Sequence, residues 1–576
     1  MSRRPRRYAG PALLLTMAVA IGGMSLAITA TWRGSQDDQA RHRTGADLRV
    51  ADPPENPELG VFGRGGVFAA LPGVTAISPA YRSTTRIAGL EATMIALDAD
   101  KLGGLMRLRG DLSDDGLPAM AARLRAGRPE LPMVPLTGDR LELEVTVTAD
   151  PALYPEIPLT FTLADALGVW REVSAGPLTP GVNRVVLDVG ALRGRTGSAG
   201  GAGGVGGVGG VGSAGGAVAL RGMAFAMPVP GHGGEVRVTV AGLPLPEGTG
   251  WAHAIQRPGR LGGERLTAGA DGFELLLPRP QEAEGAGDPQ PVVLTLAGEG
   301  ERVPASMADP GDKRAPLPVI VSRDLATAMK AGPGQVTLVE LERRVTAVRI
   351  AGIVDSLPTG EAGRPAVLLD LPTAQARAQA WATALKPVTE WWASTRDGDT
   401  APALAALREH PQWSATAVDL PGLRTTLRDD PLASGLQGAL TLGFVAALAF
   451  AALGFLVNAA VAARERSNEF AILRALGVSF RQVFGLLAIE QTFIIGLSMV
   501  AGLALAGVVG GLVVPTIVLT GQASAVTPAV LLEIPWPATL AMAGAVTLLL
   551  FAIVAALART LRKQGLGQAL RIGEER

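Results

Sequence analysis

The sequence contains no cysteine, and only 4% of its 576 residues are aromatic. Without cysteine the chain can form neither disulfides nor thiolate metal sites, and it has no thiol nucleophile. The four histidines are scattered without the close spacing of a metal site, so we expect no bound metal. Lysine plus arginine and aspartate plus glutamate both number 52, and this balance gives no indication of nucleic-acid binding.

Sequence motifs of catalysis are also missing. The chain has no GxxxxGK[ST] phosphate-binding loop, no GxSxG turn and no HExxH helix. A GxGxxG pattern occurs only within the glycine tract at residues 197–217, where composition alone produces it, and we interpret this tract as a flexible loop. We therefore expect no enzymatic activity, no catalytic residue and no cofactor in this chain.

Long apolar runs, in contrast, occur four times. The runs at residues 9–32, 434–463, 483–512 and 536–558 each reach the roughly 20 residues that a helix needs to cross a bilayer. A basic start followed by an apolar run also describes a cleaved signal peptide. Because the first run is long for that role and three more follow, we favour an uncleaved anchor.

Arginine and lysine are unevenly distributed around these runs. They gather before the first run, between the second and third, and after the fourth, whereas residues 516–533 contain none. Cytoplasmic loops carry the excess of such residues. We predict a multi-pass protein of the cell membrane, in contact with lipid, with both termini and residues 464–482 in the cytoplasm and residues 33–430 outside it.

The large region between the first and second runs has mainly β character. Residues 141–147, LELEVTV, alternate with the two-residue period of a half-buried strand, and further such runs follow up to residue 246. We interpret 136–246 as a β-sandwich. It would interrupt an α+β domain whose early part is 46–110 and whose later part is 316–420.

These features predict an α-helical membrane protein with four transmembrane helices, one before and three after a large extracytoplasmic α+β domain that a β-sandwich interrupts. The expected divisions are a cytoplasmic tip (1–8), the first transmembrane helix (9–32), the first part of the α+β domain (33–135), the β-sandwich (136–246), the second part of the α+β domain (247–430), the second transmembrane helix (434–463), a cytoplasmic coupling segment (464–482), the third transmembrane helix (483–512), an extracytoplasmic loop (513–535), the fourth transmembrane helix (536–558) and a cytoplasmic tail (559–576).

The coupling segment, residues 464–482, is charged although it lies between two apolar runs. Glu465, Glu469, Leu473 and Leu476 fall on one stripe of a 3.6-residue period, and Gly477 is suited to end the helix. A stripe of two carboxylates and two leucines suits a protein groove with apolar and cationic groups. A solvated turn whose arginines only fix the topology explains the same residues, and the physical argument does not separate the two.

A resemblance to a known family bears on this choice. The segment ERSNEFAILRALGVSFRQVFGLLAIEQ resembles the signature of FtsX-like permeases, the MacB and lipoprotein-releasing type of ABC transporter subunit. The matching residues are Glu465, Arg466, Glu469, Arg474, Ala475, Gly477 and Glu490. The order of one span, a large outer domain and three further spans is similar to that family as well.

The resemblance implies a permease subunit on which a separate ABC-type ATPase docks. The docking residues that it implies are Glu465, Arg466, Glu469, Leu473, Arg474, Leu476 and Gly477. ATP hydrolysis would drive two paired permeases, either a homodimer or a heterodimer with a related chain, and would move their outer domains for export or for lipid or lipoprotein handling. The start of the sequence also resembles the internal junction of longer tandem permeases.

Two alternatives remain at this point. A non-transporting transmembrane regulator would use the same ATPase coupling to signal to an extracytoplasmic partner such as a cell-wall hydrolase. A carbohydrate-binding module on a membrane anchor would need no ATPase, but it would not explain three further spans.

Glu490 is the one ionisable residue well inside an apolar run. A charge at the centre of a bilayer costs roughly 2.5–3.5 kcal/mol on insertion scales. Glu490 follows Arg481 by about nine residues, or roughly 13 Å of helical rise, so it lies short of the midplane. It would either pair inside the helix bundle or reach the polar headgroups, and we favour pairing.

Overall fold

The computed structural model describes most of the chain. The described residues are 6–53, 59–129, 132–193, 217–229, 234–243, 245–247, 249–255, 265–269, 271–278, 287–298, 311–342, 344–360, 364–381, 383–413, 416–429, 431–465, 480–520 and 526–571. They divide into two compact units. We call Met1–Gln39 with Arg424–Arg576 the helical unit, and Ala40–Leu423 the sheet unit.

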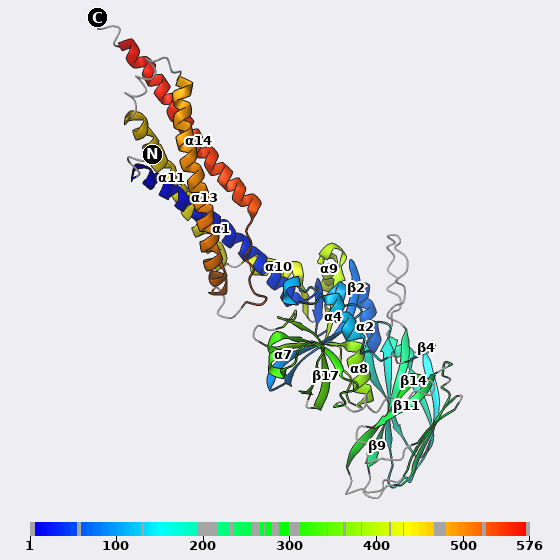
Figure 1. Cartoon of the computed structure of the whole chain (residues 1–576). Coiled ribbons are helices and arrows are strands. Elements are labelled where there is room, and N and C mark those ends of the chain that lie inside the picture. Colours follow the sequence, from blue (N-terminus) through cyan, green and yellow to red (C-terminus); the bar gives the residue numbers. More distant parts are fainter. Residues whose placement is uncertain are drawn as a thin grey trace. The chain divides into compact units, whose positions relative to one another are not determined.

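Long apolar helices build the helical unit (Figure 1). They are α1 (Arg6–Thr44), whose last residues enter the sheet unit, α11 (Pro431–Glu465), α13 (Phe480–Thr520) and α14 (Trp536–Arg571). Among the described residues, four helices are long and apolar enough to cross a membrane, within Ala12–Thr44, Gln437–Val461, Ile489–Val513 and Trp536–Leu557. This confirms the predicted layout of one apolar helix before the large domain and three after it.

A nine-stranded mixed sheet forms the centre of the sheet unit, with the strand order β16-β17-β15-β18-β3-β2-β19-β1-β20. Its strands are β1 (Leu48–Ala51), β2 (Val74–Ile87), β3 (Leu90–Leu97), β15 (Leu317–Ser322), β16 (Val336–Leu341), β17 (Arg344–Val354), β18 (Ala366–Asp370), β19 (Glu390–Thr395) and β20 (Thr416–Asp419). Three strands come from before the sandwich in sequence and six from after it, so the sheet belongs to an interrupted domain.

Helices cover both faces of this sheet. On β3, Ile95 and Leu97 pack in one core with α3 (Leu102–Leu105) and α4 (Leu117–Arg125), while Met94 and Ala96 pack in another core with α7 (Arg323–Met329) and the start of α8 (Leu371–Ala380). Successive side chains of a strand point to opposite faces, so a strand covered on both sides is apolar throughout. The six residues of β15 are accordingly all buried.

Two further antiparallel sheets make a β-sandwich, defined here as strands β4 to β14. One sheet has the order β12-β13-β10-β5-β8; the other has the order β11-β14-β9-β6-β7, with β4 paired to β9. The strands are β4 (Val134–Leu136), β5 (Arg140–Thr148), β6 (Ile157–Asp165), β7 (Trp170–Leu178), β8 (Gly181–Asp188), β9 (Val218–Val229), β10 (Val236–Ala241), β11 (Thr249–Ile255), β12 (Arg265–Gly269), β13 (Gly272–Leu277) and β14 (Gly287–Gly298). Phe273 packs against Phe225 and Trp251 across the two sheets.

The sandwich is longer than the sequence predicts. Residue 246 is the expected end, yet strands β11 to β14 follow it and complete both sheets. These strands are separated by segments rich in glycine, proline and charge, so periodicity alone does not connect them to the preceding strands. The glycine tract at 197–217 lies outside the described residues except for its last residue, Ala217.

Candidate functional site

Helix α1 contacts the three other long apolar helices, α11, α13 and α14, at positions where one of the two contacting residues is glycine. A Cβ atom added at Gly502 of α13 would lie 2.7 Å from Val19 Cβ and 2.9 Å from the carbonyl oxygen of Thr16. On α1 itself, a Cβ atom at Gly22 would lie 2.5 Å from the ring of Phe444 on α11 and 2.6 Å from the sulfur of Met542 on α14. Small residues allow this close approach of helices in a membrane.

Polar side chains are also buried within this bundle. Gln491 and Ser498 on α13 are 3% and 2% exposed, and the Ser498 hydroxyl lies 3.3 Å from the carbonyl oxygen of Ala12, to which it donates. Glu490, the ionisable group that the sequence singles out, is half-buried on the same helix and makes an interaction of its own. Its neighbour Gln491 is thus the more deeply buried polar residue, although no local sequence pattern distinguishes it.

Beyond the bundle, α1 and α10 (Leu420–Arg428) are joined by charge. The Asp37 carboxylate on α1 lies 3.1 Å from Arg424 Nε and 2.8 Å from Arg428 Nη2. All three side chains are partly exposed, and an isolated exposed ion pair contributes about 1 kcal/mol or less. Two arginines on one carboxylate restrict its position more than a single pair would.

Both of these helices continue into neighbouring strands of the nine-stranded sheet. Strand β1 follows α1 and β20 precedes α10, and the two strands pair antiparallel from Leu48 opposite Asp419 to Ala51 opposite Thr416. The other edge of β1 pairs with β19. The two chain segments that leave the sheet unit therefore start from adjacent strands.

Asp47 fixes the junction between α1 and β1. Its carboxylate, 3% exposed, accepts hydrogen bonds from Arg107 Nε at 3.1 Å and Nη2 at 2.9 Å, and from the backbone amide of Thr395 at 3.1 Å. Its carbonyl oxygen accepts from the amide of Leu420 at 2.9 Å, at the first residue of α10. Asp47 thus contacts both of the segments that lead to the apolar helices.

The predicted coupling segment falls largely outside the described residues. Helix α11 ends at Glu465 and α13 begins at Phe480. Arg466, Glu469, Leu473, Arg474, Leu476 and Gly477 lie between them, and nothing beyond the helical backbone is described for Glu465. The docking role of these residues stays a prediction. Among the described residues, no group of three or more histidine, aspartate or glutamate side chains is placed to hold a metal ion.

Comparison with known families adds to this geometry. Residues 441–565 match the model of the FtsX-like permease C-terminal domain, a range that contains most of α11, all of α13 and most of α14. The match confirms the family that the sequence motif indicates. No curated protein matches the chain.

Replacing Gly502 by leucine is expected to lower the apparent melting temperature of the protein in mild detergent by several degrees, because the new side chain collides with α1 and overpacking costs about 1–3 kcal/mol. Gly507→Leu on the same helix is the matched control, since no atom lies within 4 Å of a Cβ atom added there. Both changes remove a helical glycine, so equal melting temperatures for the two variants would contradict the packing described here.

Proposed function

We propose, starting from the FtsX-like permease C-terminal domain at residues 441–565, that the chain is the membrane-spanning subunit of an ABC-type complex of the FtsX or MacB kind. FtsX-like permeases generally work with an ABC ATPase partner. In this chain the ATPase docks on residues 464–482 at the cytoplasmic side. The chain itself supplies no catalytic group, and ATP is hydrolysed by the partner.

The observation that carries the proposal is the pairing of β1 with β20. A displacement of α1 or α11 reaches the sheet unit through two chain segments, and these segments end in adjacent hydrogen-bonded strands. The Asp37 and Asp47 contacts tie the same segments together on either side of the junction. Such an arrangement suits the mechanical transmission of movement from apolar helices to a large outer domain, for export or for lipid and lipoprotein handling.

A second permease chain pairs with this one in the proposal. Apolar side chains face outward on the described helices, among them Leu442 and Phe450 on α11 and Val500 and Leu512 on α13, each more than 60% exposed. In a membrane such faces contact lipid or another apolar helix. We assign part of them to a second permease subunit and the remainder to lipid.

Glu469→Lys or Leu473→Asp is expected to abolish copurification with the ATPase, because each change removes a group from the predicted docking stripe. The measurement is purification in mild detergent with identification of every copurifying chain. Ser467→Lys, on the opposite side of the same predicted helical period, is the control for added charge and should retain the ATPase. An intact complex with both stripe variants would eliminate the docking assignment.

The absence of native cysteine allows a direct test of orientation. A membrane-impermeant maleimide applied to intact cells should label Glu156→Cys, an exposed residue of the sandwich, and should label Ser467→Cys only after lysis. The expectation follows from the arginine and lysine bias around the apolar runs. Labelling of Ser467→Cys in intact cells would make ATPase docking at this segment impossible.

Asp37→Lys is expected to leave the ATPase bound but to reduce the ATP-dependent movement of the sheet unit by about half or more, because like charges would then face each other. Paired spin labels in the sheet units of two subunits would measure that movement. Reversing the charges of the two arginines as well, with Arg424→Glu and Arg428→Glu, should restore the movement. If the sheet unit of the Asp37→Lys variant moves as far as that of the unchanged protein, the cluster of Asp37, Arg424 and Arg428 does not transmit force.

A further inference from the structure

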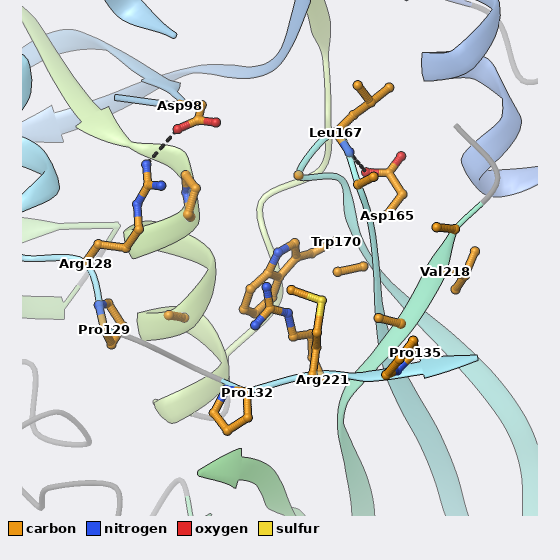
Figure 2. A pocket seen from close by; sticks show the side chains of 18 of the residues that line it. Asp98, Arg128, Pro129, Pro132, Pro135, Asp165, Leu167, Trp170, Val218 and Arg221 are labelled. Atoms are coloured by element: carbon orange, nitrogen blue, oxygen red, sulfur yellow. Dashed lines mark hydrogen bonds and ion pairs between the residues drawn. The ribbon is translucent and has the colours of Figure 1, made fainter. Parts of the chain in front are cut away.

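The sheet unit contains a pocket that the proposed function does not use. It has a volume of about 840 Å³ and lies where the sandwich meets the residues after β3 and the start of α8 (Figure 2). Pockets of roughly 300–1,000 Å³ are typical of small-molecule sites. The sandwich contributes the β6–β7 loop and the start of β9 to its wall.

The lining of this pocket is apolar except for five charged side chains. The uncharged lining residues are prolines, alanines, a glycine and larger apolar residues, among them Pro129, Pro132, Met133, Leu167 and Trp170. Among these described residues there is no side-chain hydroxyl or amide group. A sugar would need several such partners for its hydroxyl groups, because a buried polar group left unpaired is costly. The pocket therefore suits an apolar body with few polar groups.

Two of the charged lining residues already neutralise each other. Arg128 Nη2 lies 2.7 Å from Asp98 and 2.7 Å from the fully buried carboxylate of Asp370, and Arg128 Nη1 lies 2.8 Å from Asp100. Although burial acts to lower it, the Asp370 and Asp98 carboxylates raise the pKa of Arg128 above its ordinary value. The charges of Arg128 and Asp98 are thus already paired within the protein.

Two other cations have contacts within the wall as well. Lys101 Nζ donates to the carbonyl oxygen of Leu167 at 3.2 Å and lies 3.9 Å from Asp98. The Arg221 guanidinium lies 5.0 Å from the ring centroid of Trp170, over its face. Figure 2 shows Arg221 and Trp170 stacked in the middle of the lining, with Arg128 and Asp165 on opposite sides of this pair.

Asp165, the fifth charged residue, is different. It is 9% exposed, and its Oδ1 accepts hydrogen bonds from the backbone amides of Leu167 at 2.9 Å and Val169 at 2.8 Å. Its other oxygen, Oδ2, is buried and has no hydrogen-bond partner among the described residues. Burial raises the pKa of this carboxyl to about 6, although the backbone amides act in the opposite direction. Leaving a buried carboxylate oxygen without a hydrogen-bond donor is energetically unfavourable.

We propose that this pocket binds an apolar molecule that carries one ammonium group, with the ammonium group donating to Asp165 Oδ2 and the apolar body lying against the prolines and Trp170. A charge-assisted hydrogen bond from the ligand satisfies Asp165 Oδ2, which has no hydrogen-bond partner among the described residues. The proposal does not depend on the permease function, because all of its residues lie within the sheet unit.

The test compares three probes of similar shape: 1-naphthylmethylamine, 1-naphthylmethanol and 1-naphthoate. Their binding to the full chain in lipid nanodiscs is measured by equilibrium dialysis, and the binding to empty nanodiscs is subtracted. The amine should bind at least about tenfold more tightly than the alcohol and the acid, a difference of about 1.4 kcal/mol. Asp165→Asn should remove this advantage, since it keeps an oxygen for the two backbone amides and loses the charge. Asp150→Asn, which also accepts from a backbone amide in the sandwich, is the matched control and should change nothing.

A second variant keeps the test decisive if Asp165→Asn does not fold. Met133 lines the pocket and is 47% exposed, so Met133→Trp should narrow the pocket without disturbing a core and should weaken binding of all three probes. An amine that binds no more tightly than the alcohol, an acid that binds most tightly, or an advantage that survives Asp165→Asn would each overturn the proposal.

Discussion

Strand β1 forms backbone hydrogen bonds along both of its edges, with β19 on one side and β20 on the other. Because β1 follows α1 and β20 precedes α10, this pairing joins the two chain segments that lead to the apolar helices within one part of the sheet. Sliding either strand would break all of its ladder bonds together and would turn its side chains to the wrong face. The proposed transmission of movement depends on this constraint, since unpaired segments would move independently.

Buried charge strengthens the same part of the sheet. Arg49 on β1 lies 3.3 Å from Glu390 on β19, and Glu390 also accepts from Arg82 Nε on β2 at 2.6 Å and from Trp392 Nε1 at 2.9 Å. Burial lowers the pKa of Arg49, and the charge of Glu390 acts against that shift. Removing ions from water is costly, so such a cluster is favourable only in one geometry. The main effect of this cluster is therefore to favour one register of β1, β19 and β2, and its contribution to stability is smaller.

The four apolar helices can be predicted from the sequence because one physical rule determines them. A segment that crosses a bilayer must form its backbone hydrogen bonds within itself as a helix. Each of the four long apolar runs therefore predicts a helix directly. The end of the sandwich could not be located, because β12 and β13 are short and this hairpin joins its sheet by pairing with β10, from which β11 separates it in sequence. The cluster of Asp37, Arg424 and Arg428 could not be predicted either, since no local sequence pattern connects the two arginines with Asp37. The assignment of the docking residues is based on a family motif and not on the geometry of the structure.

The β6–β7 loop connects the pocket to the part of the sheet that contains β1. Leu167 in this loop accepts from Lys101 at the pocket wall, and its side chain reaches Gly65 on α2 (Gly60–Ala69), where an added Cβ atom would lie 2.6 Å from Leu167 Cδ1 and 2.5 Å from the ring of Trp391 on β19. Close-packed interiors transmit small shifts because they have no free space to absorb them. Because the Leu167 amide donates to Asp165, the same carboxylate that faces the pocket also holds the loop residue that packs against Gly65.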